Sequence, residues 1–134
     1  MDSYVRNNKP EIDITSLAHS GGYKGQELTG LRLVNNGLGV AMGIDCYLCA
    51  DDLEGIKFAR IERLSPNEES RNSLGFLYSN TPFFNNHLEN LRIAFKYKNR
   101  DGFEFVSGRY LSQTKRADGN YNINNSPLGD YFEI

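Results

Sequence analysis

The sequence contains no tryptophan and only two histidines, His19 and His87, which lie far apart in the chain. A Ser–His–Asp triad needs a histidine that its neighbours orient, and neither that set nor a Gly-x-Ser-x-Gly elbow can be assembled here. Sugar-binding platforms depend on flat aromatic side chains, so the lack of tryptophan argues against a carbohydrate-active protein. We therefore expect both histidines in loops or on the surface, and we predict that the protein is not an enzyme.

A surplus of positive charge is also missing, because 15 basic residues stand against 17 acidic ones and the formal net charge is −2. Proteins that bind nucleic acids need a basic surface to neutralise phosphates, so we expect no nucleic-acid partner. No segment approaches the ~20 apolar residues that cross a bilayer, and no apolar signal segment follows Met1. We expect neither a membrane span nor a secretion signal in this chain.

Cysteine is scarce as well, and the only two, Cys46 and Cys49, have the C-x-x-C spacing of some zinc and redox sites. Zinc needs about four ligands, and a thioredoxin-type site needs its first cysteine at a helix N-terminus. Both cysteines here lie in an alternating strand pattern, where an odd offset points them to opposite faces. We expect two unrelated free thiols, one in the core and one outside, with no metal and no cofactor. Free thiols favour a reducing compartment such as the cytoplasm.

The chain does hold a clear strand–turn–strand signal at residues 35–39, which read Asn-Asn-Gly-Leu-Gly between two alternating apolar runs. This pattern predicts two strands joined by a glycine-dependent turn. No helix signal follows the turn, so we interpret Gly37 and Gly39 as residues that let the backbone turn tightly rather than as ligand contacts.

Alternation of apolar and polar residues predicts seven short strands separated by turn signals. They span residues 11–17, 27–35, 39–50, 56–64, 71–79, 91–98 and 103–112. The connection at 80–90 is expected to hold one helical turn, and residues 99–102 have the composition of a hairpin turn. A length of 134 residues fits one domain. We therefore predict a single antiparallel β-sandwich or barrel with a core at about 11–112, followed by a polar tail at 113–134 that docks as an edge strand.

The predicted core consists of apolar side chains on one face of each strand. These are Ile12, Ile14, Leu31, Leu33, Val40, Met42, Ile44, Cys46, Leu48, Ile56, Phe58, Leu74, Phe76, Leu91, Ile93, Phe95, Tyr97, Phe103 and Phe105.

Three segments resemble ligand-binding loops, but each lacks a residue or an element that such a loop requires. Residues 21–25 are glycine-rich, yet a phosphate loop must open a helix and a strand follows instead. Residues 118–124 place oxygen ligands at alternate positions, but a calcium loop needs glycine and an acid where Ile123 and Gly129 stand. The acidic cluster at 51–54 is interpreted as a hairpin turn. We expect no metal site in any of them.

Three stretches together resemble a known family. Residues 33–41 read LVNNGLGVA, residues 61–68 read IERLSPNE, and residues 93–105 read IAFKYKNRDGFEF. This set resembles a group of uncharacterised prokaryotic immunoglobulin-like domains that share an N-x-G-x-G-x-A turn, over residues 11–112. The resemblance implies an immunoglobulin-like antiparallel β-sandwich of about seven strands and brings no catalytic residues with it. Because members often follow a membrane helix, it also implies an alternative, an accessory domain of a membrane-tethered protein.

Aromatic residues on loops often anchor partner proteins, so Phe83, Phe84, Tyr131 and Phe132 are our candidate partner-binding residues. The alternative is that Phe83 or Phe84 fills the open end of the sandwich and that the C-terminal tail docks along the edge of a sheet. The predicted function is a non-catalytic protein-binding or assembly module whose partner is another protein or a second copy. A small carbohydrate-binding or hydrolytic domain stays open as a further alternative, because spacing alone does not exclude a carboxylate pair.

Overall fold

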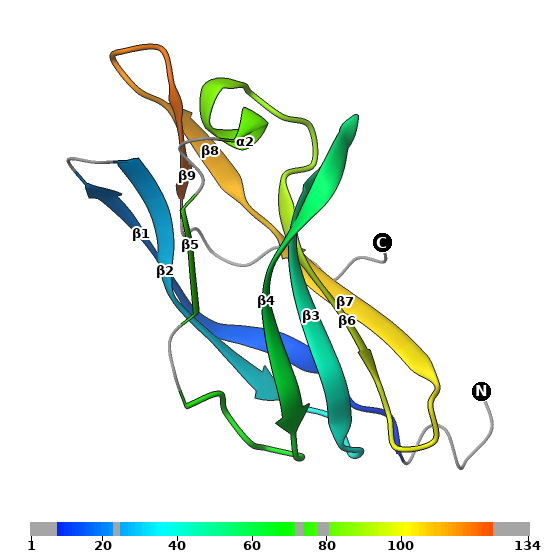
Figure 1. The fold of residues 1–134 in the computed structure, drawn as a ribbon. Coiled ribbons are helices and arrows are strands. Elements are labelled where there is room, and N and C mark those ends of the chain that lie inside the picture. Colours follow the sequence, from blue (N-terminus) through cyan, green and yellow to red (C-terminus); the bar gives the residue numbers. More distant parts are fainter. Residues whose placement is uncertain (1–7, 23–24, 72–73, 78–80, 125–134) are drawn as a thin grey trace.

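The computed structural model of the chain describes residues 8–22, 25–71, 74–77 and 81–124 (Figure 1). Within these residues lie nine strands and one helical turn. Their bounds are β1 (Ile12–Gly22), β2 (Gly25–Asn35), β3 (Ala41–Ala50), β4 (Leu53–Leu64), β5 (Leu74–Leu77), α2 (Pro82–Asn85), β6 (Arg92–Lys98), β7 (Glu104–Tyr110), β8 (Ser112–Lys115) and β9 (Tyr121–Asn124). All pairings between these strands are antiparallel, so the predicted all-β antiparallel class is confirmed.

Two sheets enclose one hydrophobic core. The strand order is β1-β2-β5 in one sheet and β4-β3-β6-β7 in the other, and β8 pairs with β9 in a separate hairpin. Figure 1 shows the first sheet on the left and the second on the right. Ile14 and Leu33 come from one sheet, Ile44 and Phe95 come from the other, and all four are buried in the same cluster. This arrangement is consistent with a β-sandwich.

Several elements differ in extent from their predictions. Gly22 pairs with Gly25, so β1 and β2 take up most of the loop predicted at 20–25. The predicted strand at 71–79 is described only as β5, whereas the helical turn expected within 80–90 is present as α2. The start of the predicted tail forms the β8–β9 hairpin and buries Ile123. Residues 125–134 lie outside the described residues.

Gly43 changes the face that β3 turns toward the core. Its φ is +57°, and the pairing of β3 with β6 shifts register between Met42 and Asp45, as at a β-bulge. Ala41 and Ile44 are therefore both buried, although they are three residues apart. Met42, a predicted core residue, is instead 37% exposed. That prediction is wrong because simple alternation does not continue through a bulge.

The core prediction also fails at Phe103, which is 49% exposed. This residue belongs to the turn between β6 and β7 rather than to β7 itself, which begins at Glu104. The turn is built by Asn99, whose Oδ1 accepts the backbone N–H groups of Asp101 and Phe103. Gly102 takes a φ of +86°, as expected for the glycine of this hairpin.

Asn35 joins four segments of the chain at the point where it leaves the first sheet. The side chain is fully buried, and its Oδ1 accepts the N–H groups of Glu11 at 3.1 Å and Gly37 at 2.9 Å. Its Nδ2 donates to the carbonyl oxygens of Gly39 at 2.8 Å and Leu64 at 3.0 Å. All four hydrogen-bonding positions of the amide are thus filled. The turn at 35–39 does not close a hairpin but carries the chain from β2 to β3 in the opposite sheet.

Gly37 and Gly39 are required by close packing rather than by a tight turn. Neither has a positive φ. A Cβ at Gly37 would overlap the carbonyl oxygen of Lys9, and one at Gly39 would overlap that of Asn8. The N-terminal segment lies directly against the turn, and the Leu38 N–H donates to the Lys9 carbonyl at 2.9 Å. Glycine is the residue that permits this approach of two backbones.

We expect Asn35→Ala to lower the free energy of unfolding by roughly 3 kcal/mol, because it leaves several buried donors and acceptors without partners. Urea denaturation measures the change. The matched control is Asn36→Ala at the exposed neighbouring position, which should stay within about 0.5 kcal/mol of the unsubstituted protein. Equal effects of the two substitutions would contradict a central role for the Asn35 side chain.

Candidate functional site

Of the four candidate partner-binding aromatics, the structure describes Phe83 and Phe84. Phe83, at the end of the core next to β9, is 1% exposed, so its ring is unavailable to a partner and fills the core as a plug. Phe84 is half-buried, and the guanidinium carbon of Arg116 lies 5.9 Å from the centre of its ring. Tyr131 and Phe132 lie outside the described residues.

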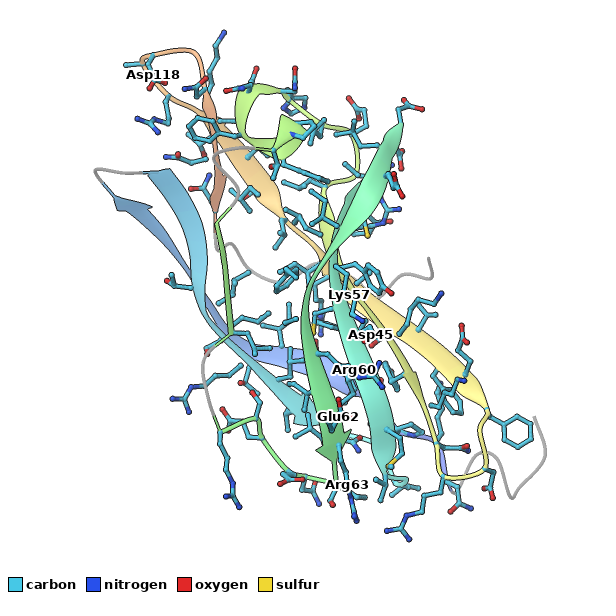
Figure 2. The ribbon with its side chains drawn as sticks, viewed as in Figure 1. Asp45, Lys57, Arg60, Glu62, Arg63 and Asp118 are labelled. Carbon is cyan, nitrogen blue, oxygen red and sulfur yellow. The ribbon has the colours of Figure 1, made fainter. Side chains whose placement is uncertain are left out.

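His87 and the acidic turn at Asp118 each have their own local partners. His87 is exposed, and its ring lies 5.7 Å from that of Tyr121, whereas the side chain of His19 is outside the described part of the chain. Asp118, in the turn after β8, accepts the Asn120 N–H and pairs with Arg116 at 3.0 Å (Figure 2). Across the described residues, no group of three or more His, Cys, Asp or Glu is placed to hold a metal ion. Nor does the described chain include a helix long and apolar enough to cross a membrane.

Both cysteines are free and buried, so the prediction that one thiol lies outside is wrong. Cys46 is fully buried, and Cys49 is 7% exposed although it lies on the other face of β3. The backbone of β4 covers Cys49, since a Cβ at Gly55 would lie 3.2 Å from its sulfur. Burial raises the pKa of the Cys46 thiol to about 12 and also raises that of Cys49. Neither thiol is set up as a nucleophile.

The outer face of the second sheet holds a shallow hollow of about 620 Å³ whose lining includes Tyr47, Lys96 and Lys98. The charges beside the hollow pair with one another: Asp45 accepts both Lys57 and Arg60 at 3.0 Å (Figure 2).

Burial alone would raise the pKa of the Asp45 carboxyl, but the hydrogen bonds from Lys57 and Arg60 outweigh it and hold that pKa below its ordinary value. Asp45 therefore stays ionised at neutral pH and serves as an anchor for two cations, not as a general acid.

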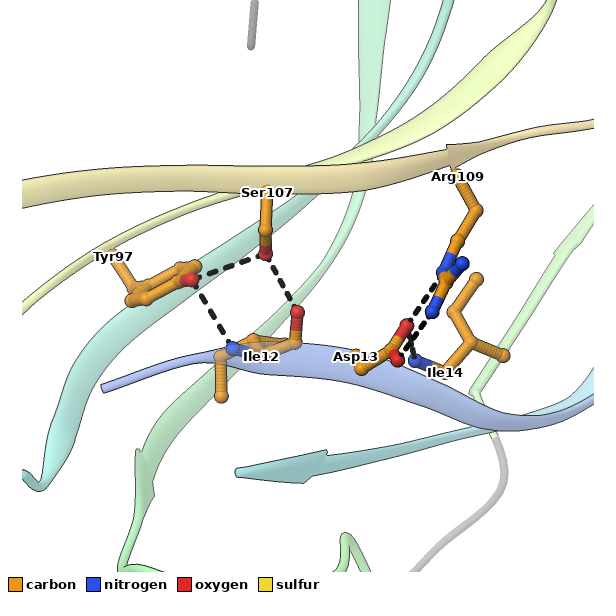
Figure 3. Close-up of polar contacts among 6 residues, drawn as sticks. All are labelled: Ile12, Asp13, Ile14, Tyr97, Ser107 and Arg109. Atoms are coloured by element: carbon orange, nitrogen blue, oxygen red, sulfur yellow. Dashed lines mark hydrogen bonds and ion pairs between the residues drawn. The ribbon is translucent and has the colours of Figure 1, made fainter. Parts of the chain in front are cut away.

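One edge of the fold is closed by side chains that reach from the second sheet to β1 (Figure 3). The Ile12 N–H donates to the Tyr97 hydroxyl at 3.1 Å, Tyr97 donates to the Ser107 hydroxyl at 3.0 Å, and Ser107 donates to the Ile12 carbonyl at 2.6 Å. Next to this ring of hydrogen bonds, Arg109 holds Asp13 through two bonds of 2.9 and 2.7 Å. These contacts occupy the N–H and C=O groups of Ile12, at the start of β1, so that this end of the strand offers no free backbone to another strand.

The opposite edge, formed by β4, is open. In the described part of the chain, β4 pairs only with β3 and stands last in its sheet. Its inward side chains Ile56, Phe58 and Ile61 are only partly buried against the core. Beside β4 lies a second hollow of about 360 Å³, lined on one side by Ile61 and on the other by residues 68–71.

The outward side of the same edge carries alternating charges. Arg60 pairs with Glu62 two positions along the strand, at 2.9 Å between Nε and Oε1. Both side chains are exposed, at 45% and 82%. The candidate site is therefore the β4 edge, with an open row of backbone groups, a hollow on its inner side and charges on its outer side.

We expect Tyr97→Phe to lower the free energy of unfolding by about 1–2 kcal/mol, because the Ile12 N–H and the Ser107 hydroxyl lose their shared partner while the ring keeps its packing. Chemical denaturation measures this loss. Tyr47→Phe removes the same hydroxyl group at a half-buried position and should change stability by less than about 0.5 kcal/mol. A stability loss in Tyr47→Phe as large as that in Tyr97→Phe would contradict the closed-edge assignment.

Both thiols should resist an aromatic disulfide reagent in the native protein at about pH 8 and react fully in urea, since burial keeps them protonated and covered. Absorbance of the released thiolate counts the reacted groups. Rapid labelling of the folded protein would show that β4 does not cover Cys49.

No protein-family model, curated protein or solved structure matches this chain.

Proposed function

We propose that this protein is a non-catalytic protein-binding or assembly module that receives an extended strand from a protein partner along the open edge of β4. The observation that carries this proposal is the contrast between the sheet edges. β4 spans Leu53–Leu64 and offers its outer side without a described strand partner. At the start of β1, by contrast, Tyr97 and Ser107 hold the backbone of Ile12.

Strand addition suits the chemistry of this edge. An added strand forms main-chain hydrogen bonds along an edge that has no strand partner among the described residues, and alternate side chains enter pockets that set specificity. Ile61 and the hollow beside it provide such a pocket on the inner side. On the outer side Arg60 and Glu62 offer one charge of each sign.

The immunoglobulin-like fold is part of the same proposal. The first, second and fifth strands lie in one sheet and the third, sixth and seventh in the other, with the fourth beside the third. This order supports an immunoglobulin-like sandwich built from β1–β7. The β8–β9 hairpin is then an addition to that sandwich. The turn at residues 35–39, which crosses between the sheets, supports similarity to the prokaryotic immunoglobulin-like domains.

Selection of binders to the purified protein from a displayed library of random peptides tests the proposal. We expect selected binders to protect amides of β4 from hydrogen exchange and to leave the β1 and β7 edges unchanged. Ile61→Lys places an inward charge on the edge, a device that blocks strand pairing, and should abolish this binding. Leu38→Lys, at a position that is 70% exposed in the turn after β2, is the matched control and should retain it.

Two results would overturn the proposal. One is a set of binders whose protection falls on the outer-face hollow rather than on β4. The other is a selection that returns no peptide protecting the β4 edge of a chain that is monomeric.

A further inference from the structure

Resting on the proposed function, we infer that the partner of the β4 edge is β4 of a second copy of this chain, paired antiparallel about a two-fold axis at Ile61. In such a pairing the same surface is used by both copies, so each residue must be compatible with its own symmetry partner. The sequence around Ile61 meets this requirement.

Charge complementarity selects the register. With the axis at Ile61, Arg60 of each copy stands directly opposite Glu62 of the other, and the pair occurs twice. Residues directly opposite in an antiparallel pair have Cβ atoms about 5 Å apart, so the opposite charges interact across the strands. An axis at Arg60 or at Glu62 places like charges against each other, and an axis at Ala59 places Arg60 opposite Phe58.

The inner side of the edge fits the same register. Ile61 of one copy meets Ile61 of the other at the axis, and both are only partly buried in the single chain. The hollow of about 360 Å³ beside Ile61 and Leu74 gives the incoming side chain room. Phe58, also partly buried, lies close to the joined edge and gains cover from it. Apolar burial thus supplies attraction, while the exposed ion pairs set the register.

This pairing ends at two copies and does not continue into a chain of molecules. A two-fold contact between β4 strands uses the open β4 edge of both copies and leaves neither copy with a second β4 edge, while Tyr97 and Ser107 hold the start of β1 at Ile12. The expected product is therefore a dimer with one continuous sheet across the two copies, not an open fibre.

Charge reversal tests the register. Sedimentation equilibrium of the unsubstituted chain should show a concentration-dependent dimer. R60E and E62R alone should each weaken the dimer roughly tenfold or more, because like charges then face each other at two places. An equimolar mixture of R60E with E62R should form a heterodimer, since opposite charges again face each other, and the double variant R60E/E62R should regain the homodimer.

Arg100→Glu is the matched control, because it changes net charge equally at an exposed position in the β6–β7 turn, away from the β4 edge. It should leave the dimer unchanged. Failure of the mixture to form a heterodimer, with both single variants folded by circular dichroism, overturns the inference. A chain that stays monomeric while selected peptides still protect β4 also overturns it but leaves the proposed function intact. Absence of both the dimer and the protecting peptides overturns both.

Discussion

The fold depends on the hydrogen bonds of one buried amide, that of Asn35. Its oxygen holds the N-terminal segment and the crossover turn, and its nitrogen holds the end of that turn and the end of β4. The N-terminal segment, the crossover turn and the end of β4 are thus fixed relative to one another. Together with the pairing of β4 to β3, this side chain places the end of the candidate interaction edge.

The edges formed by β1 and β4 differ in how side chains contact their backbone. At the start of β1, the hydroxyl groups of Tyr97 and Ser107 hold the backbone of Ile12, and Arg109 from the second sheet pairs with the side chain of Asp13. At β4, charged side chains flank the strand, but its backbone stays available. Charges on an edge discourage promiscuous pairing yet permit a partner whose charges match. Selective protection of this kind suits a module that must bind one strand and resist others.

Alternation was enough to locate most strands and the class of the fold, because period-2 patterning depends only on neighbouring residues. It could not locate the bulge at Gly43, which moved Met42 out of the core, or the cover that β4 lays over Cys49. The roles of Asn35 and of the β4 edge were also invisible, because both depend on which strands become neighbours. Strand order arises from contacts between distant residues, and sequence patterns of single strands do not encode it.

The closed edge of β1 has a consequence for synthesis of the chain. Ile12 is 85 residues before Tyr97 and 95 before Ser107, and Asp13 is 96 before Arg109. As the chain leaves the ribosome, the β1–β2 hairpin is complete long before any of the side chains that cover its edge exist. Contacts of such long range also form slowly. During translation, the start of β1 therefore presents backbone groups that are held by side chains in the folded protein, and a chaperone would meet the strand in that state.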